Sequence, residues 1–95
     1  MRTAAKVDKN QPKIVEALRR TGATVIITSQ LKNAFDILVL FQGNTFIVEV
    51  KDGDKPPSQK NLTEGELKCK AKVEKAGVKY WVIESIDDAL EMIGV

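Results

Sequence analysis

The sequence predicts one α/β domain over residues 1–95, with a mixed central β-sheet flanked by helices in the order α-β-β-β-α-β-α. Two apolar runs, 36–41 and 45–51, flank a short Gly/Asn turn, which is typical of a β-hairpin. A helix with start and stop signals separates the third predicted strand from the fourth, so those two strands should be parallel. The length of 95 residues suits a single domain with a modest core.

The first predicted elements are a helix over residues 12–21 and a strand over residues 23–28. Pro12 fits the first position of the helix, and Gly22 fits the stop just past its end. The strand Ala-Thr-Val-Ile-Ile-Thr is rich in β-branched residues, as strands are. Residues 29–35 then read as a loop that leads into the hairpin.

The charges of the hairpin lie at one end, because Asp36 opens it and Glu49 and Lys51 close it. Glu49 and Lys51 are two apart on one strand, so both point to the same face. A two-residue type II′ turn at Gly43 and Asn44 would pair Asp36 with Lys51 and bring all three onto that face, whereas a three-residue turn would put Asp36 on the other face. We predict the two-residue turn.

The second half of the chain begins with a polar loop over residues 52–61, which contains two prolines; long loops in small domains often carry function. A second helix is predicted over residues 63–76, because Thr63 and Glu66 form a capping-box pattern. Residues 79–84 should form the fourth strand. Ser85 and Asp88 should start a short last helix.

Composition excludes several kinds of site. The chain has no histidine and one cysteine, Cys69, so it cannot form a Cys/His zinc site, a Ser-His or Cys-His nucleophile pair, or an internal disulfide. No apolar run approaches the length of a membrane span and residues 1–8 show no signal-peptide core, so we expect a cytoplasmic protein without membrane contact. Any enzyme here must use carboxylates, lysine, hydroxyls or a metal ion.

Three side chains, Asp36, Glu49 and Lys51, form the candidate catalytic cluster. Two carboxylates held close together repel each other, and a hard divalent cation with oxygen ligands relieves that repulsion. A neighbouring lysine can stabilise developing negative charge. These parts suit the hydrolysis of a phosphodiester.

With Asp36-x₁₂-Glu49-Val50-Lys51 on a hairpin after a first helix, the chain resembles the PD-(D/E)XK nucleases, and within them the VRR-NUC (virus-type replication-repair nuclease) branch. The resemblance extends over nearly the whole chain. Phe35 stands where the family usually has proline, which bears on the shape of the loop. The further matching motifs are Asp8-x-x-Gln11, Glu49-Val50-Lys51-Asp52-Gly53, Lys55-Pro56-Pro57-Ser58, Leu62-Thr63, and Val82-Ile83-x-Ser85.

The resemblance implies a restriction-endonuclease-like fold and a DNA endonuclease dependent on Mg²⁺ or Mn²⁺. Asp36, Glu49 and the Val50 carbonyl would bind the ion, and Lys51 would assist the attacking water. It further implies a homodimer that acts on branched DNA such as a Holliday junction, from a bacterium or a phage. The residues expected to support the site are Asp8, Gln11, Glu16, Ser58 and Glu66.

Other readings of the same residues remain open. The charged cluster could be a strand-end salt bridge, Asp8 and Gln11 could act as caps, and Glu16 could pair with Arg20 on the surface. The domain could also be a DNA-binding module without activity, or a protein-interaction domain. Among the lysines, Lys55 and Lys60 are expected to contact DNA, whereas a solvated surface and a phosphate-binding stripe are equally good readings of Lys68, Lys72 and Lys75. Tyr80 and Trp81 are expected in the core or at a dimer contact.

Overall fold

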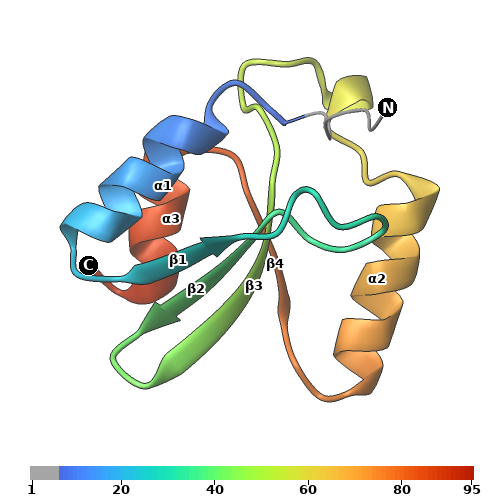
Figure 1. Cartoon of the computed structure of the whole chain (residues 1–95). Coiled ribbons are helices and arrows are strands. Elements are labelled where there is room, and N and C mark those ends of the chain that lie inside the picture. The colour runs from blue at the N-terminus through green and yellow to red at the C-terminus, as the bar shows by residue number, and fades with distance from the viewer. Residues whose placement is uncertain (1–6) are drawn as a thin grey trace.

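The computed structural model describes residues 7–95, and these form the predicted succession of helices and strands (Figure 1). A short 3₁₀ turn inside the polar loop, η1, is the one additional element in this part of the chain. In chain order the elements are α1 (Gln11–Arg20), β1 (Thr24–Ile27), β2 (Ile37–Phe41), β3 (Asn44–Val50), η1 (Pro57–Gln59), α2 (Glu64–Lys75), β4 (Tyr80–Ile83) and α3 (Ile86–Ile93).

The four strands form one mixed sheet in the order β1-β2-β3-β4. β1 pairs with β2, and β2 with β3, in antiparallel fashion. β4 runs parallel to β3, which confirms the parallel pair predicted from the helix between them. The helices flank the sheet: α1 and α3 lie on one side and α2 on the other (Figure 1). This mixed, helix-flanked architecture is the one that the sequence predicted.

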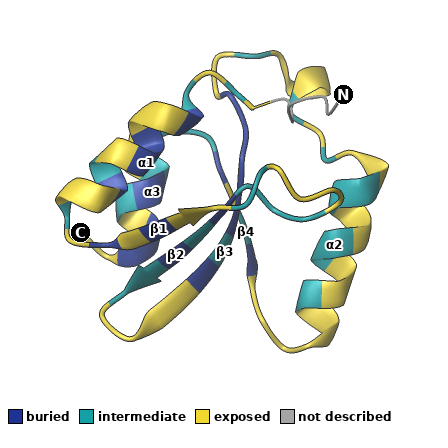
Figure 2. Ribbon diagram, in the orientation of Figure 1, coloured by how far each residue is buried: buried dark blue, intermediate teal, exposed yellow. Residues whose placement is uncertain are grey.

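The core lies between the sheet and the pair α1 and α3. Side chains alternate along a strand, so Ile37 and Val39 of β2 and Val48 of β3 all point to this side, and all three are fully buried. Ile14 and Leu18 meet them from α1 and are equally buried. Figure 2 shows the resulting asymmetry: dark, buried segments gather around α1, α3 and the sheet, whereas α2 carries none.

The helix ends follow the sequence signals. Thr63 accepts a hydrogen bond from the Glu66 N–H, and the Glu66 side chain accepts one from the Thr63 N–H, so the predicted capping box is complete. The Ser85 hydroxyl caps α3 by accepting from the Asp88 N–H. α1 begins at Gln11, one residue earlier than predicted, so Pro12 is the second residue of the helix and still lies in its first turn.

The hairpin turn differs from the prediction by one residue. Phe41 pairs with Asn44, so the two turn residues are Gln42 and Gly43 rather than Gly43 and Asn44. Both have positive φ, 50° and 82°, as a type I′ turn requires, whereas the expected type II′ turn has Gly first. The type I′ turn places the glycine second, where a positive φ costs it little.

The corrected register still brings the three charged residues to one face. It pairs Ile37 with Val48, so its continuation sets Asp36 opposite Glu49, two residues away from the expected partner Lys51. A shift of two residues preserves the face to which each side chain points, whereas a shift of one reverses it. Asp36, Glu49 and Lys51 therefore share the α2 side of the sheet.

Candidate metal and catalytic site

A cavity of about 280 Å³ opens where β2 begins and β3 ends, beside α2. The strands contribute Asp36, Glu49 and Lys51 to its lining. Asp8 lines it from the segment before α1, and Thr63 and Glu66 line it from the start of α2. The polar loop contributes Lys55, Gln59 and Asn61. Five segments of the chain thus converge on the three predicted catalytic residues.

The carboxyl groups of Asp36 and Glu49 line the same cavity, and each shifts the pKa of the other. The backbone holds Asp36 in place, because the Val50 N–H donates to Asp36 Oδ2 at 2.8 Å. Val50 points its side chain into the core, so only its backbone can face the site. Glu49 is only 2% exposed, which makes an isolated negative charge on it costly.

Lys51 is held between two acids. Its ammonium donates to Glu66 Oε1 at 2.8 Å and lies 3.8 Å from Glu49 Oε2. Glu66 Oε1 accepts from the Thr63 N–H as well, so one carboxylate both caps α2 and fixes the lysine. Glu66 is therefore both the predicted cap of α2 and a residue that lines the cavity.

Tyr80 was not predicted as part of the site, yet its hydroxyl donates to Glu49 Oε1 at 3.2 Å. It is buried at the start of β4 and pairs with Ile47, which places it on the same face as Glu49. The sequence predicted a core or dimer position for Tyr80. It could not place the hydroxyl beside Glu49, because the register between β3 and β4 depends on how α2 crosses the sheet. Trp81 points to the other face, where its ring packs edge-on against Phe46.

The pKa values of Glu49 and Asp36 are raised in the folded chain, whereas that of Glu66 is lowered. Burial, and then the neighbouring Glu66 and Asp36 carboxyls, raise the pKa of Glu49 to about 10. Burial also raises the pKa of Asp36. For Glu66, burial is outweighed by hydrogen bonds from Glu49, Lys51 and the Thr63 N–H, which lower its pKa to about 2. At neutral pH the metal-free site therefore holds a proton on Glu49 beside an ionised Glu66.

Lys51 and Tyr80 both keep their protons at neutral pH. Although burial opposes it, the Glu66 carboxylate raises the pKa of Lys51. Burial and the adjacent Glu49 raise the pKa of Tyr80. The hydroxyl of Tyr80 is thus a neutral donor to Glu49, and Lys51 is a fixed positive charge.

Two ion pairs join the polar loop to other segments of the chain. Lys55 Nζ lies 2.9 Å from Asp8 Oδ1, and Lys60 Nζ lies 3.0 Å from Glu84 Oε1. Asp8 thereby reaches the site, and Lys55 lies at its edge. Lys60 does not line the cavity, because its partner Glu84 holds it at the end of β4.

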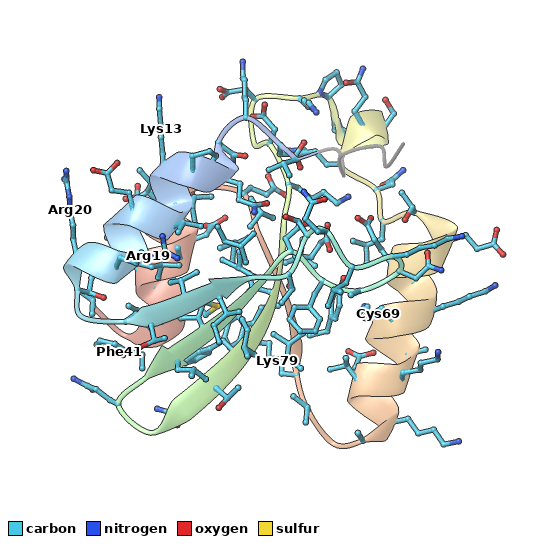
Figure 3. All side chains as sticks on the ribbon, in the orientation of Figure 1. Lys13, Arg19, Arg20, Phe41, Cys69 and Lys79 are labelled. Atoms are coloured by element: carbon cyan, nitrogen blue, oxygen red, sulfur yellow. The ribbon has the colours of Figure 1, made fainter. Side chains whose placement is uncertain are left out.

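Three of the expected supporting residues lie elsewhere. Glu16 is on the exposed side of α1 and pairs with Arg20 at 2.6 Å, which is the surface reading of that pair; Figure 3 shows Arg20 extending outward from α1. Gln11 is 3% exposed and lines a separate hollow between α1 and the end of β1. Ser58 is exposed on η1. Of the residues predicted around the first helix, only Asp8 reaches the cavity, because only the segment before Gln11 lies beside it.

The donor set fits a hard divalent cation. Within residues 7–95, no three or more Asp, Glu, Cys or His side chains are grouped so that they could hold an ion by themselves. Asp36 and Glu49 supply two carboxylates, and a Val50 carbonyl would add a third oxygen. Mg²⁺ usually takes one or two carboxylates and completes its shell with water and phosphate oxygens, so two carboxylates are enough.

Of the comparisons with known proteins, the one with solved structures supports the fold. No family model matches the chain, and no curated protein matches its sequence. Among solved structures, one described as "VRR_NUC domain" aligns with a TM-score of 0.62 and 22% identity, and the alignment covers 88% of this chain and 94% of that one. Within residues 7–95, no helix has the length and apolar character needed to cross a membrane. The resemblance predicted from the motifs is thus confirmed for the fold: the chain has the fold of a VRR_NUC domain.

Proposed function

We propose that this protein is a metal-dependent DNA endonuclease that hydrolyses phosphodiesters with the residues Asp36, Glu49 and Lys51. The observation that carries the proposal is that Asp36, Glu49 and Lys51 line one cavity of a VRR_NUC fold, with the Lys51 ammonium 3.8 Å from Glu49 Oε2. Clustered ionisable groups with strongly shifted pKa values are characteristic of catalytic sites.

The metal would be Mg²⁺ or Mn²⁺, held by Asp36, Glu49 and the Val50 carbonyl. When bound, such an ion supplies charge neutralisation at the phosphate and a more acidic water. Lys51 would hydrogen-bond a non-bridging phosphate oxygen as negative charge accumulates there, while water attacks phosphorus and a P–O bond breaks. Glu66 keeps the Lys51 ammonium charged and directed toward the cavity until substrate arrives.

The proposed substrate is branched DNA, with a Holliday-junction-like form as the leading case, and the proposed assembly is a homodimer. A two-fold junction is best matched by a two-fold protein. Exposed apolar side chains on the α2 side of the molecule, Ile26, Leu67 and Val82 among them, offer a surface for a second copy. Light scattering should therefore give twice the 10.5 kDa chain mass.

The decisive experiment incubates the protein with linear, flap and four-way DNA, with and without Mn²⁺. We expect metal-dependent cleavage with a preference for the branched forms. Lys51→Ala should bind the same DNA with unchanged affinity yet cleave at least about a hundredfold more slowly, since removal of one charge-stabilising donor costs 10²–10³ in rate. Lys13→Ala, at an exposed position of α1 on the other side of the sheet, is the matched lysine control.

Cleavage that does not depend on Lys51 would contradict the assignment of the site. Binding without turnover by the wild-type protein, at any metal concentration, would identify a DNA-binding module instead. The absence of salt-dependent DNA affinity would exclude both and leave a protein-interaction domain.

A further inference from the structure

The two oxygens of Glu49 have different neighbours. Oε1 accepts the hydrogen bond from the Tyr80 hydroxyl at 3.2 Å, and Oε2 faces the Lys51 ammonium at 3.8 Å. The Tyr80 ring is itself buried, and β4 pairs with β3 in a fixed parallel register, so this donor cannot swing away without disturbing the sheet. The plane of the Glu49 carboxyl group is therefore set from β4.

A carboxylate can bind a metal ion through one oxygen or through both. Mg²⁺ requires a nearly ideal octahedron at short distances, which a two-oxygen carboxylate distorts, whereas Ca²⁺ is larger and accepts either mode. A hydrogen bond that engages one oxygen favours binding through the other. Groups that orient a metal ligand in this way commonly change metal affinity by about 10- to 100-fold when removed.

We propose that Tyr80 is a positioning residue that holds Glu49 Oε1 and thereby presents Oε2 as the single Glu49 ligand, which selects small octahedral cations over Ca²⁺. The inference rests on the proposed function, because it assumes that Glu49 binds the ion. It extends that function by assigning metal selectivity to a residue outside the Asp-Glu-Lys motif. Tyr80 itself touches neither the ion nor the substrate.

The test is Tyr80→Phe, which keeps the buried ring and removes only the hydroxyl. Mg²⁺ and Ca²⁺ affinities are measured by calorimetry, and Mn²⁺ affinity by electron paramagnetic resonance, without DNA. We expect Mg²⁺ and Mn²⁺ to bind about tenfold more weakly, and Ca²⁺ to change by less than about threefold, so the Mg²⁺/Ca²⁺ affinity ratio falls. Trp81→Phe, the adjacent residue on the opposite face, should leave this ratio unchanged.

The chain has one tyrosine, so ¹³Cζ-labelled tyrosine gives one signal in the wild-type protein, whether or not the variant folds. The chemical shift of that signal should change as Mg²⁺ is added. The change should saturate with the same Kd that calorimetry gives. Two results would overturn the role of Tyr80 and leave the nuclease proposal intact. One is an unchanged Mg²⁺/Ca²⁺ affinity ratio in Tyr80→Phe. The other is a tyrosine chemical shift that does not change on Mg²⁺ addition while calorimetry shows binding. Failure of the wild type to bind any of the three cations would overturn both.

Discussion

Glu49 lowers the stability of the fold when no metal ion is bound. It is buried beside two other carboxyls, and its pKa rises from 4.5 to about 10 in the folded chain. Between those values the unfolded chain loses the proton and the native chain keeps it, so this residue lowers stability as pH rises from 4.5 toward 10. Such a loss of stability is expected where a site is arranged to bind a ligand and not for stability alone.

The variant Glu49→Gln should therefore be more stable than the wild type at pH 8, and close to it at pH 4.5, in metal-free buffer. The amide is neutral, similar in shape, and can donate to the neighbouring carboxylate as the protonated acid does. Thermal unfolding at the two pH values measures the difference, with Glu16→Gln on the exposed side of α1 as control. A Glu49→Gln protein that is no more stable than the wild type at pH 8 would show that Glu49 is ionised in the fold.

At the scale of the element, α2 depends on its ends. None of its residues is buried, so little of its stability comes from packing. Its first turn is held by the capping box of Thr63 and Glu66, and the same Glu66 oxygen holds Lys51. The start of this helix is thus part of the candidate site.

Removal of the cap by Thr63→Ala should cost about 1 kcal/mol of unfolding free energy, the usual penalty for loss of a threonine N-cap. Amide exchange in the first turn of α2 should also speed up, because its N–H groups lose their partner. Urea titration and hydrogen exchange measure the two effects. Thr45→Ala, on the exposed part of β3, is the threonine control; equal costs for both variants would contradict the capping role.

The hairpin turn provides a second prediction at this scale. Gln42 has φ 50°, a conformation that is unfavourable for most side chains but better tolerated by asparagine. Gln42→Asn should stabilise the protein by less than about 1 kcal/mol, since the whole cost of such a conformation is about 1–2 kcal/mol. Gly43→Ala should destabilise it. Urea midpoints that move in the opposite directions would exclude a type I′ turn at these residues.

At the scale of the whole molecule, the proposed binding of a metal ion should be linked to proton release. Sheet, polar loop and α2 together enclose Glu49, and the proton that it carries must leave before the carboxylate can bind a cation. Metal affinity should therefore rise with pH, by up to about tenfold per unit between pH 7 and 9, below the raised pKa of about 10. Calorimetry in two buffers of different ionisation enthalpy should count close to one proton released per ion.

Independence of the metal affinity from pH over that range would contradict this linkage. In the same measurement Glu49→Gln should bind the ion far more weakly and release no proton. That pairing separates proton release at Glu49 from any release at Asp36, whose pKa is also raised.

Much of this molecule was determined by the sequence alone. β-branched runs, Pro12, Gly22, the Thr63 capping box and the Ser85 cap set the order of helices and strands, because these are local signals of a few residues each. The side-chain alternation of the hairpin also fixed which face Asp36, Glu49 and Lys51 share, since any two-residue turn near Gly43 gives the same parity.

Only the tertiary structure decided what depends on contacts between distant segments. It chose Glu49 over Lys51 as the residue opposite Asp36, because registers two residues apart bury the same side chains and differ only in turn geometry. It brought Asp8 to the cavity while leaving Glu16 and Ser58 in solvent, and it added Tyr80 through the pairing of β3 with β4. Local sequence cannot specify such positions, because they follow from how a helix crosses the sheet and how a loop folds back over it.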